Sequence, residues 1–144
     1  MDTSPIGKYL SITHRAHTSL VDKNFKEKFN ISHGQVFILI KIFKNEGINQ
    51  HKLCKEYNLN KAGVGRIIKK LEAKNLVKRK PDPKDKRKKM IFLTEKAKSL
   101  KPEFIELLET VEAKIKNNLT EEEIEMFLKI LKKIYNNLSD NKFD

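Results

Sequence analysis

Residues 60–94 read NKAGVGRIIKKLEAKNLVKRKPDPKDKRKKMIFLT, and this stretch decides the fold. Its first part predicts a helix, because apolar residues recur at positions i, i+3, i+4 and i+7 of one helical face between Val64 and Leu71. Asn60 can cap this helix, since its side-chain oxygen can accept a hydrogen bond from a free backbone N–H. Asn75 tolerates the left-handed conformation in which many helices end, so the helix is expected to stop there.

Two short strands are predicted after this helix, at residues 77–80 and 88–93. The segment between them contains Pro81 and Pro83, which exclude a helix because proline lacks a backbone N–H and clashes with the preceding turn. This segment is therefore expected to form the tip of a β-hairpin.

A second short helix is predicted immediately upstream. Asn49 can cap a segment that runs to Tyr57 with Leu53 facing inward, and residues 58–59 form a tight turn. Two short helices joined by such a turn make a helix-turn-helix, and the hairpin that follows makes it a winged helix.

Four further helix signals surround this unit. A first helix should end near Phe29, and a second is expected from the capping residue Ser32 to Gly47. Two more begin at Thr94 and Thr120, each followed by apolar residues at helical spacing.

The chain has 144 residues, which is the length of one domain with one hydrophobic core. We therefore expect a single, mainly α-helical domain. A winged helix-turn-helix occupies residues 32–93, and long helices flank it at residues 1–31 and 94–144.

The net charge of +12 is confined to one region of the chain. Residues 49–89 hold fifteen basic and four acidic side chains, so this region carries +11 and the remainder only +1. A localised excess of positive charge over a helix-turn-helix favours a polyanionic partner, which here means nucleic acid.

Several classes of protein are disfavoured by composition. The longest uncharged run, residues 29–40, is too short to cross a bilayer, and the first residues lack a secretory pattern, so a cytoplasmic location without a membrane partner is expected. One cysteine, Cys54, leaves no disulfide framework or cysteine-rich zinc site. Without a phosphate loop or an activated nucleophile, we expect no catalytic residues, no metal site and no cofactor.

Several segments within residues 53–94 match one known pattern. Residues 64–72 and 76–79 fit a recognition helix that leads into a wing, and Asp85-Lys86-Arg87 form an Asp-x-Arg element. Residues 90–96 read MIFLTEK, which is similar to a trailing Leu-Thr-x-x-Gly motif. Together they resemble the multiple-antibiotic-resistance regulator (MarR) family of winged-helix transcription regulators.

The resemblance implies a homodimer. In this family the first, fifth and sixth helices join two copies, so residues 1–31 and 94–144 would be dimerisation helices, and two recognition helices would read a pseudo-palindrome in double-stranded DNA. The residues alone leave another possibility open, because the last helix could instead pack inside its own monomer. The sequence departs from the family at Asn75 and Ala97, where glycine is usual, and these changes concern local turn geometry.

The second helix of a helix-turn-helix enters the major groove, so its polar face is the candidate DNA-binding face. That face carries Lys61, Ala62, Gly65, Arg66 and Lys69. Arg66 can bond guanine with both of its terminal nitrogens, or it can clamp a phosphate without sequence preference. Gly63 and Gly65 weaken a helix, and close approach of the backbone to DNA or to a neighbouring helix would offset that cost.

The wing supplies the remaining candidate residues. Arg87 at its tip is expected to enter a minor groove, and Asp85 can hold the guanidinium in place. The surrounding lysines should attract phosphates whatever the sequence. They are Lys84, Lys86, Lys88 and Lys89, while Lys70 and Lys74 on the preceding helix should face phosphate or solvent.

The resemblance also implies an effector, because members of the family commonly respond to small phenolic or anionic ligands held between the two lobes. Residues that could line such a crevice lie on the first two helices. They are Tyr9, Thr13, His17, Phe37 and Ile40. The reactive first-helix cysteine of peroxide-sensing relatives is absent from the sequence, so sensing through a thiol is not expected.

The function predicted from sequence is therefore a sequence-specific repressor that binds an operator as a homodimer and is released by an effector. The alternative is a sequence-indifferent, chromatin-like DNA binder without an effector. A winged helix serving RNA is disfavoured because residues 60–89 contain no aromatic side chain on which bases could stack.

Overall fold

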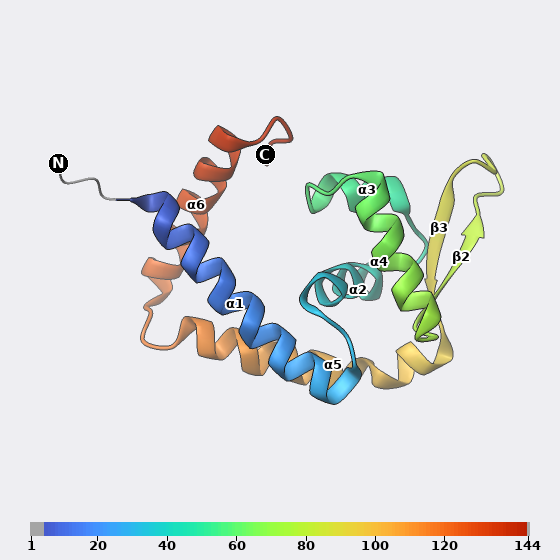
Figure 1. Cartoon of the computed structure of the whole chain (residues 1–144), viewed down its shortest axis with the longest axis horizontal. Coiled ribbons are helices and arrows are strands. Elements are labelled where there is room, and N and C mark those ends of the chain that lie inside the picture. Colours follow the sequence, from blue (N-terminus) through green and yellow to red (C-terminus); the bar gives the residue numbers. More distant parts are fainter. Residues whose placement is uncertain (1–4, 144) are drawn as a thin grey trace.

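The computed structural model describes residues 5–143, which form six helices and one three-stranded sheet (Figure 1). In chain order the elements are α1 (Ile6–Phe29), α2 (His33–Lys44), β1 (Ile48–Asn49), α3 (Gln50–Glu56), α4 (Lys61–Ala73), β2 (Val77–Pro81), β3 (Lys89–Leu93), α5 (Glu95–Lys116) and α6 (Glu121–Leu138). The mainly helical winged fold expected from the sequence is confirmed.

The capping residues act as their positions suggest. The side chains of Asn60, Thr94 and Thr120 accept hydrogen bonds from backbone N–H groups at the starts of α4, α5 and α6. Asn75 has a φ of 57°, so it adopts the left-handed conformation expected where α4 turns into the wing.

The sheet contains one strand that was not predicted. Its order is β1-β3-β2, and Ile48 of β1 pairs with Ile91 of β3. The chain leaves α2 after Lys44, three residues before the predicted end at Gly47, and Gly47 takes a φ of 85° to bring β1 alongside the hairpin. A two-residue strand has no periodicity of its own, so only pairing with β3 reveals it.

The hairpin differs slightly from its predicted bounds. Strand β2 extends to Pro81, and β3 begins at Lys89 rather than at residue 88. Proline is tolerated at the end of β2 because this is an edge strand of the sheet.

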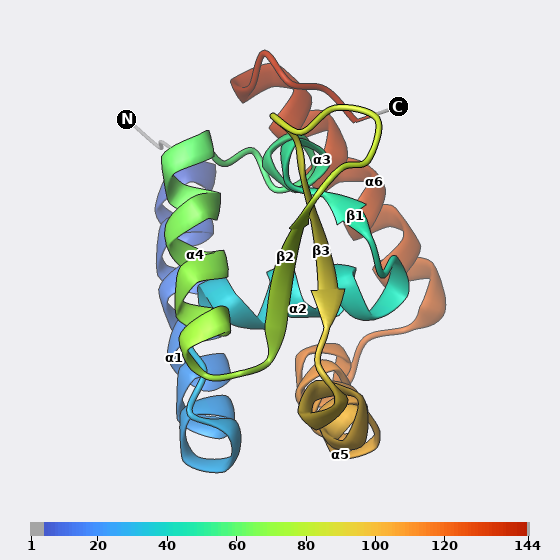
Figure 2. The same ribbon diagram turned by 90° about the vertical axis from the view of Figure 1, so that its right-hand side faces the viewer.

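The molecule has two parts, the winged helix-turn-helix and the long helices. The wing lies at one end and α6 at the other, and α5 runs between them (Figure 1), while Figure 2 views the molecule from the end where the wing lies. Aromatic contacts join the two parts, because Phe104 of α5 packs against Phe25 of α1 and Phe43 of α2 with ring centroids 5.1 and 5.2 Å apart. All three rings are buried, so α2 shares one core with the long helices.

Helix α6 stands at the end of the molecule farthest from the wing (Figure 1). None of its residues is buried. Several large apolar side chains on it are about half exposed or more, namely Met126, Phe127, Leu128, Ile130 and Leu138. In the single chain, α6 is therefore not packed into the hydrophobic core.

Candidate nucleic-acid interface

Helix α4 is divided into an apolar and a cationic side. Val64, Ile68 and Leu71 are fully buried against the rest of the winged helix. The candidate residues lie on the opposite side, where Lys61, Ala62, Arg66 and Lys69 are exposed and Gly65 is partly exposed. Within residues 5–143 Arg66 forms no ion pair, so its guanidinium is available to a partner.

The tip of the wing is shaped by two aspartates. The Asp82 carboxylate accepts a hydrogen bond from the Lys84 backbone N–H at 2.8 Å, and the Asp82 backbone N–H donates to the Lys88 carbonyl at 2.9 Å. Such bonds from an aspartate to the backbone two residues later are typical of tight turns. The loop therefore has a defined shape although it is rich in lysine.

The predicted pairing of Asp85 with Arg87 is confirmed. One carboxylate oxygen of Asp85 accepts from the Arg87 backbone N–H at 3.1 Å and from its Nε at 3.2 Å. These bonds hold the pKa of the Asp85 carboxyl below its usual range. The Arg87 side chain is nevertheless 92% exposed, so it is held at its base while its outer nitrogens face solvent.

A cationic hollow of about 620 Å³ separates the wing from the helix-turn-helix. It is lined by Asn49, Gln50, His51, Cys54, Lys61, Arg79, Arg87, Lys88 and Lys89, and no acidic residue is among them. It thus unites Lys61 of the recognition helix with three wing residues predicted from sequence. Gln50, His51 and Arg79 also contribute to this surface and were not predicted from the sequence.

The alternation of side chains along a strand could have predicted that Arg79 faces α4. Arg79 lies two residues after the buried Val77, so the two side chains point to the same side of β2. There the Arg79 guanidinium forms an ion pair of 2.7 Å with Glu72 of α4. This pair ties the wing to α4.

The two glycines at the start of α4 have different surroundings. A Cβ added to Gly63 would lie 3.1 Å from Oδ1 of Asn60, the same atom that accepts a hydrogen bond from the Gly63 N–H. A Cβ added to Gly65 would meet only the Gln50 amide, at an ordinary contact distance of 3.7 Å. Packing inside the chain therefore accounts for Gly63 and leaves Gly65 unexplained.

The prediction that Lys74 faces phosphate or solvent is wrong. Its ammonium does not face a phosphate or open solvent, because it donates to Oε1 of Gln35 at 2.8 Å and to the carbonyl of Asn30. It therefore fastens the end of α4 to the α1–α2 junction. Lys70, by contrast, is exposed as expected.

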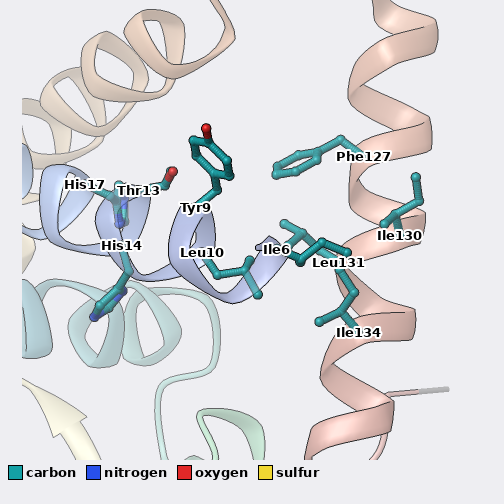
Figure 3. Close-up of a pocket in the computed structure, with 10 residues that line it drawn as sticks. All are labelled: Ile6, Tyr9, Leu10, Thr13, His14, His17, Phe127, Ile130, Leu131 and Ile134. Atoms are coloured by element: carbon teal, nitrogen blue, oxygen red, sulfur yellow. The ribbon is translucent and has the colours of Figure 1, made fainter. Parts of the chain in front are cut away.

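The residues proposed for an effector crevice do not all lie together. A cavity of about 660 Å³ lies between α1 and α6, and Tyr9, Thr13 and His17 line it (Figure 3). Phe37 and Ile40 do not line this cavity; the Phe37 ring instead lies against His17, with centroids 5.8 Å apart. On the α6 side the lining is entirely apolar, from Phe127, Ile130, Leu131 and Ile134.

The described part of the chain offers little for other chemistry. Residues 5–143 contain no group of three side chains placed to hold a metal ion. In the same range, none of the helices is long and apolar enough to span a membrane. Cys54 is partly buried, and burial raises the pKa of its thiol, which makes the thiol less reactive.

Comparison with known proteins identifies relatives of the winged helix-turn-helix region. Residues 31–89 match the MarR family. Among curated proteins, the HTH-type transcriptional regulator YybA of Bacillus subtilis, itself uncharacterized, is 35% identical over 88 residues, or 61% of this chain. The regulator MgrA of Staphylococcus aureus is 30% identical over 82 residues, or 57% of this chain. The matches span only 58% and 55% of the length of these two relatives.

A solved structure extends the similarity over nearly the full chain. It is a Listeria monocytogenes protein classed with the MarR family transcriptional regulators and solved in complex with a 26-mer DNA. The two chains are 33% identical and superpose with a TM-score of 0.85, covering 96% of this chain and 91% of the other. The chain therefore belongs to the MarR family of winged-helix transcriptional regulators.

Proposed function

We propose that this protein is a sequence-specific repressor that binds double-stranded DNA as a homodimer. The observation that carries the proposal is the arrangement of Arg87: its base is held by Asp85, and its free end stands beside a cationic hollow that no acidic side chain lines. A related protein of the same fold was solved with a 26-mer DNA, which supports a duplex as the partner.

The exposed face of α4 enters the major groove in this proposal, with Arg66 nearest the base edges. The wing lies along the duplex so that Arg87 enters the adjacent minor groove, where the negative potential favours a guanidinium. Lys84, Lys86 and Lys88 hold phosphates and set the register of the protein on the DNA.

The long helices provide the surface on which a second copy of the chain would bind. Phe127 and Leu128 of α6 are 53% and 52% exposed, and Ile6 and Tyr9 of α1 are 61% and 60% exposed. Exposed apolar residues on two neighbouring helices mark an interface, and a two-fold copy of the same surface would bury them. Two symmetric recognition helices would then fit half-sites about one turn of DNA apart.

Release by an effector fits the position of the cavity between α1 and α6. Its apolar wall suits a flat apolar or phenolic body, while Tyr9, Thr13 and His17 offer polar groups at its α1 side. A ligand there that favours one spacing of the two winged units would change DNA affinity.

Selection of bound sites from random duplex DNA tests the central claim. A pseudo-palindromic motif is the expected result. If no motif emerges, the protein is a sequence-indifferent binder and the repressor proposal is wrong.

Fluorescence anisotropy on the selected site then tests the role of the wing. Arg87→Ala should weaken binding by about 1–3 kcal/mol, the range of one specific contact. Arg15→Ala removes the same side chain from an exposed position on α1 and serves as the matched control. Equal losses in the two variants would exclude the placement of the wing in a groove.

A further inference from the structure

Three of the four histidines in the chain meet where α1 packs on α2. The ring of His33, the first residue of α2, lies edge-to-face against His14 and His17 of α1, with centroids 5.7 and 5.4 Å apart. Phe37 packs against His33 with centroids 5.1 Å apart. We call His14, His17 and His33 the histidine joint.

The surroundings of His33 disfavour a proton on its ring. Burial lowers the pKa of His33, and so do the neighbouring charges of His17 and then His14, while the carboxylate of Asp22 acts in the opposite direction. His33 also sits at the N-terminal end of α2, where the partial positive charge of the helix repels an imidazolium.

The other elements near the joint offer no compensating charge. Helix α6 contributes only apolar side chains to the cavity that His14 and His17 line. Tyr57, the residue that follows α3, donates its hydroxyl hydrogen bond to the Phe37 carbonyl at 2.7 Å and brings no charge to the joint. The one carboxylate acting on His33 is that of Asp22, which also accepts the His33 backbone N–H at 2.7 Å.

We propose that the histidine joint makes the contact between α1 and α2 sensitive to pH, so that adding protons to its imidazoles loosens this contact. Helix α1 belongs to the surface that would join two copies, and α2 shares a core with α4. Loosening between them would change how the recognition helices are held and lower DNA affinity, a step that rests on the proposed function.

The direction of the effect follows from linkage. An unfolded histidine has a pKa of about 6.5, and the pKa of His33 lies below that in the folded protein. The folded state therefore binds fewer protons than the unfolded state as the pH falls below about 6.5, and stability is lost in that window. Above that pH the contribution of the joint to stability is fully present.

Without the joint, acidification should strengthen the electrostatic attraction between the protein and DNA. Each added proton makes the protein more cationic, which by itself strengthens binding to phosphates. A fall in DNA affinity between pH 7.5 and 5.5 is therefore a signature of the joint rather than of net charge.

Urea unfolding of the full chain at pH 7.5 and 5.5 tests the proposal without DNA. The wild type should lose stability at pH 5.5, and His33→Gln should reduce that loss by at least half. The double variant His14→Gln/His17→Gln, which keeps His33, should also reduce it and serves if His33→Gln folds poorly. His51→Gln, a change at the exposed fourth histidine, should leave the loss unchanged.

Anisotropy with duplex DNA at the same two pH values tests the coupling. The dissociation constant of the wild type should rise roughly fivefold or more on acidification, a typical size for coupling between sites, and the rise should shrink in the joint variants. Equal pH dependence of unfolding in all four proteins would overturn the proposal. Failure to bind DNA at either pH would contradict the proposed function instead, because the urea result decides the joint independently.

Discussion

At the scale of single residues, Asp85 presents an apparent contradiction. A carboxylate in a loop that faces phosphates should weaken DNA binding by repulsion. Its two hydrogen bonds to Arg87 give another reason for its presence, because they hold the guanidinium in one orientation before DNA arrives. If repulsion dominates, removing the Asp85 carboxylate should strengthen DNA binding; if positioning of Arg87 dominates, it should weaken DNA binding.

Asp85→Asn separates these two effects. We expect weaker DNA binding although the variant gains a positive unit of net charge, since the hydrogen bonds that hold the Arg87 guanidinium are weakened. Anisotropy at two salt concentrations measures this, and Glu109→Gln, at an exposed position in the second half of α5, gives the same change in charge. Tighter binding by Asp85→Asn would show that repulsion outweighs positioning.

Gly65 carries the second prediction at this scale. Gly65→Ala should raise the free energy of unfolding by about 0.5–1 kcal/mol, because alanine favours the helix and its Cβ meets only ordinary contacts. If the bare backbone is needed for close approach to DNA, the same variant should bind DNA more weakly. Urea unfolding and anisotropy on one preparation measure both, and unchanged affinity would remove Gly65 from the interface.

At the scale of elements, α3 is a short helix that depends on its neighbours for position. The hydroxyl of Tyr57, at its C-terminal end, donates to the carbonyl of Phe37 in α2 at 2.7 Å. Burial raises the pKa of Tyr57 to about 12. The unfolded value is about 10, so the contribution of this group to stability is present below pH 10 and is lost as the pH rises toward 12.

Tyr57→Phe tests this link between two helices. It should lower the free energy of unfolding by about 0.5–1.5 kcal/mol, the usual net value of one hydrogen bond. Tyr135→Phe is the matched control, because within residues 5–143 the Tyr135 hydroxyl makes no hydrogen bond and its removal should cost little. Urea unfolding near pH 7 compares the two, and equal losses would mean that the Tyr57 bond does not hold α3 in place.

At the scale of the whole molecule, α6 is the element least explained by a single chain. Its apolar face is open, and the cavity beside α1 has an apolar wall on the α6 side. A second copy of the chain would cover this surface, so dimerisation and DNA binding should fail together.

Paired substitutions on α6 test this expectation. Phe127→Glu/Leu128→Glu should sediment as a monomer and lose at least about tenfold in DNA affinity, because one recognition helix then binds without its partner. Asn137→Glu adds an acidic group at an exposed polar position of the same helix and should remain a dimer. Analytical ultracentrifugation gives the result, and a dimeric double variant would place the interface elsewhere.

Local signals in the sequence are enough to place the six helices and the hairpin and to indicate a negatively charged partner. Apolar spacing in residues 64–71, the caps Asn60 and Thr94, and the two prolines of the wing are local signals, because helix starts and hairpin tips depend on neighbouring residues. The positive charge over residues 49–89 is likewise a property of composition, and the pairing of Asp85 with Arg87 spans only two residues.

Only the tertiary structure decided which distant residues meet. Strand β1 exists because Ile48 pairs with Ile91, and Lys74 reaches Gln35 instead of solvent. The histidine joint brings residues of α1 against the start of α2 across a chain reversal. Such contacts depend on packing between elements far apart in sequence, which no local pattern of residues encodes.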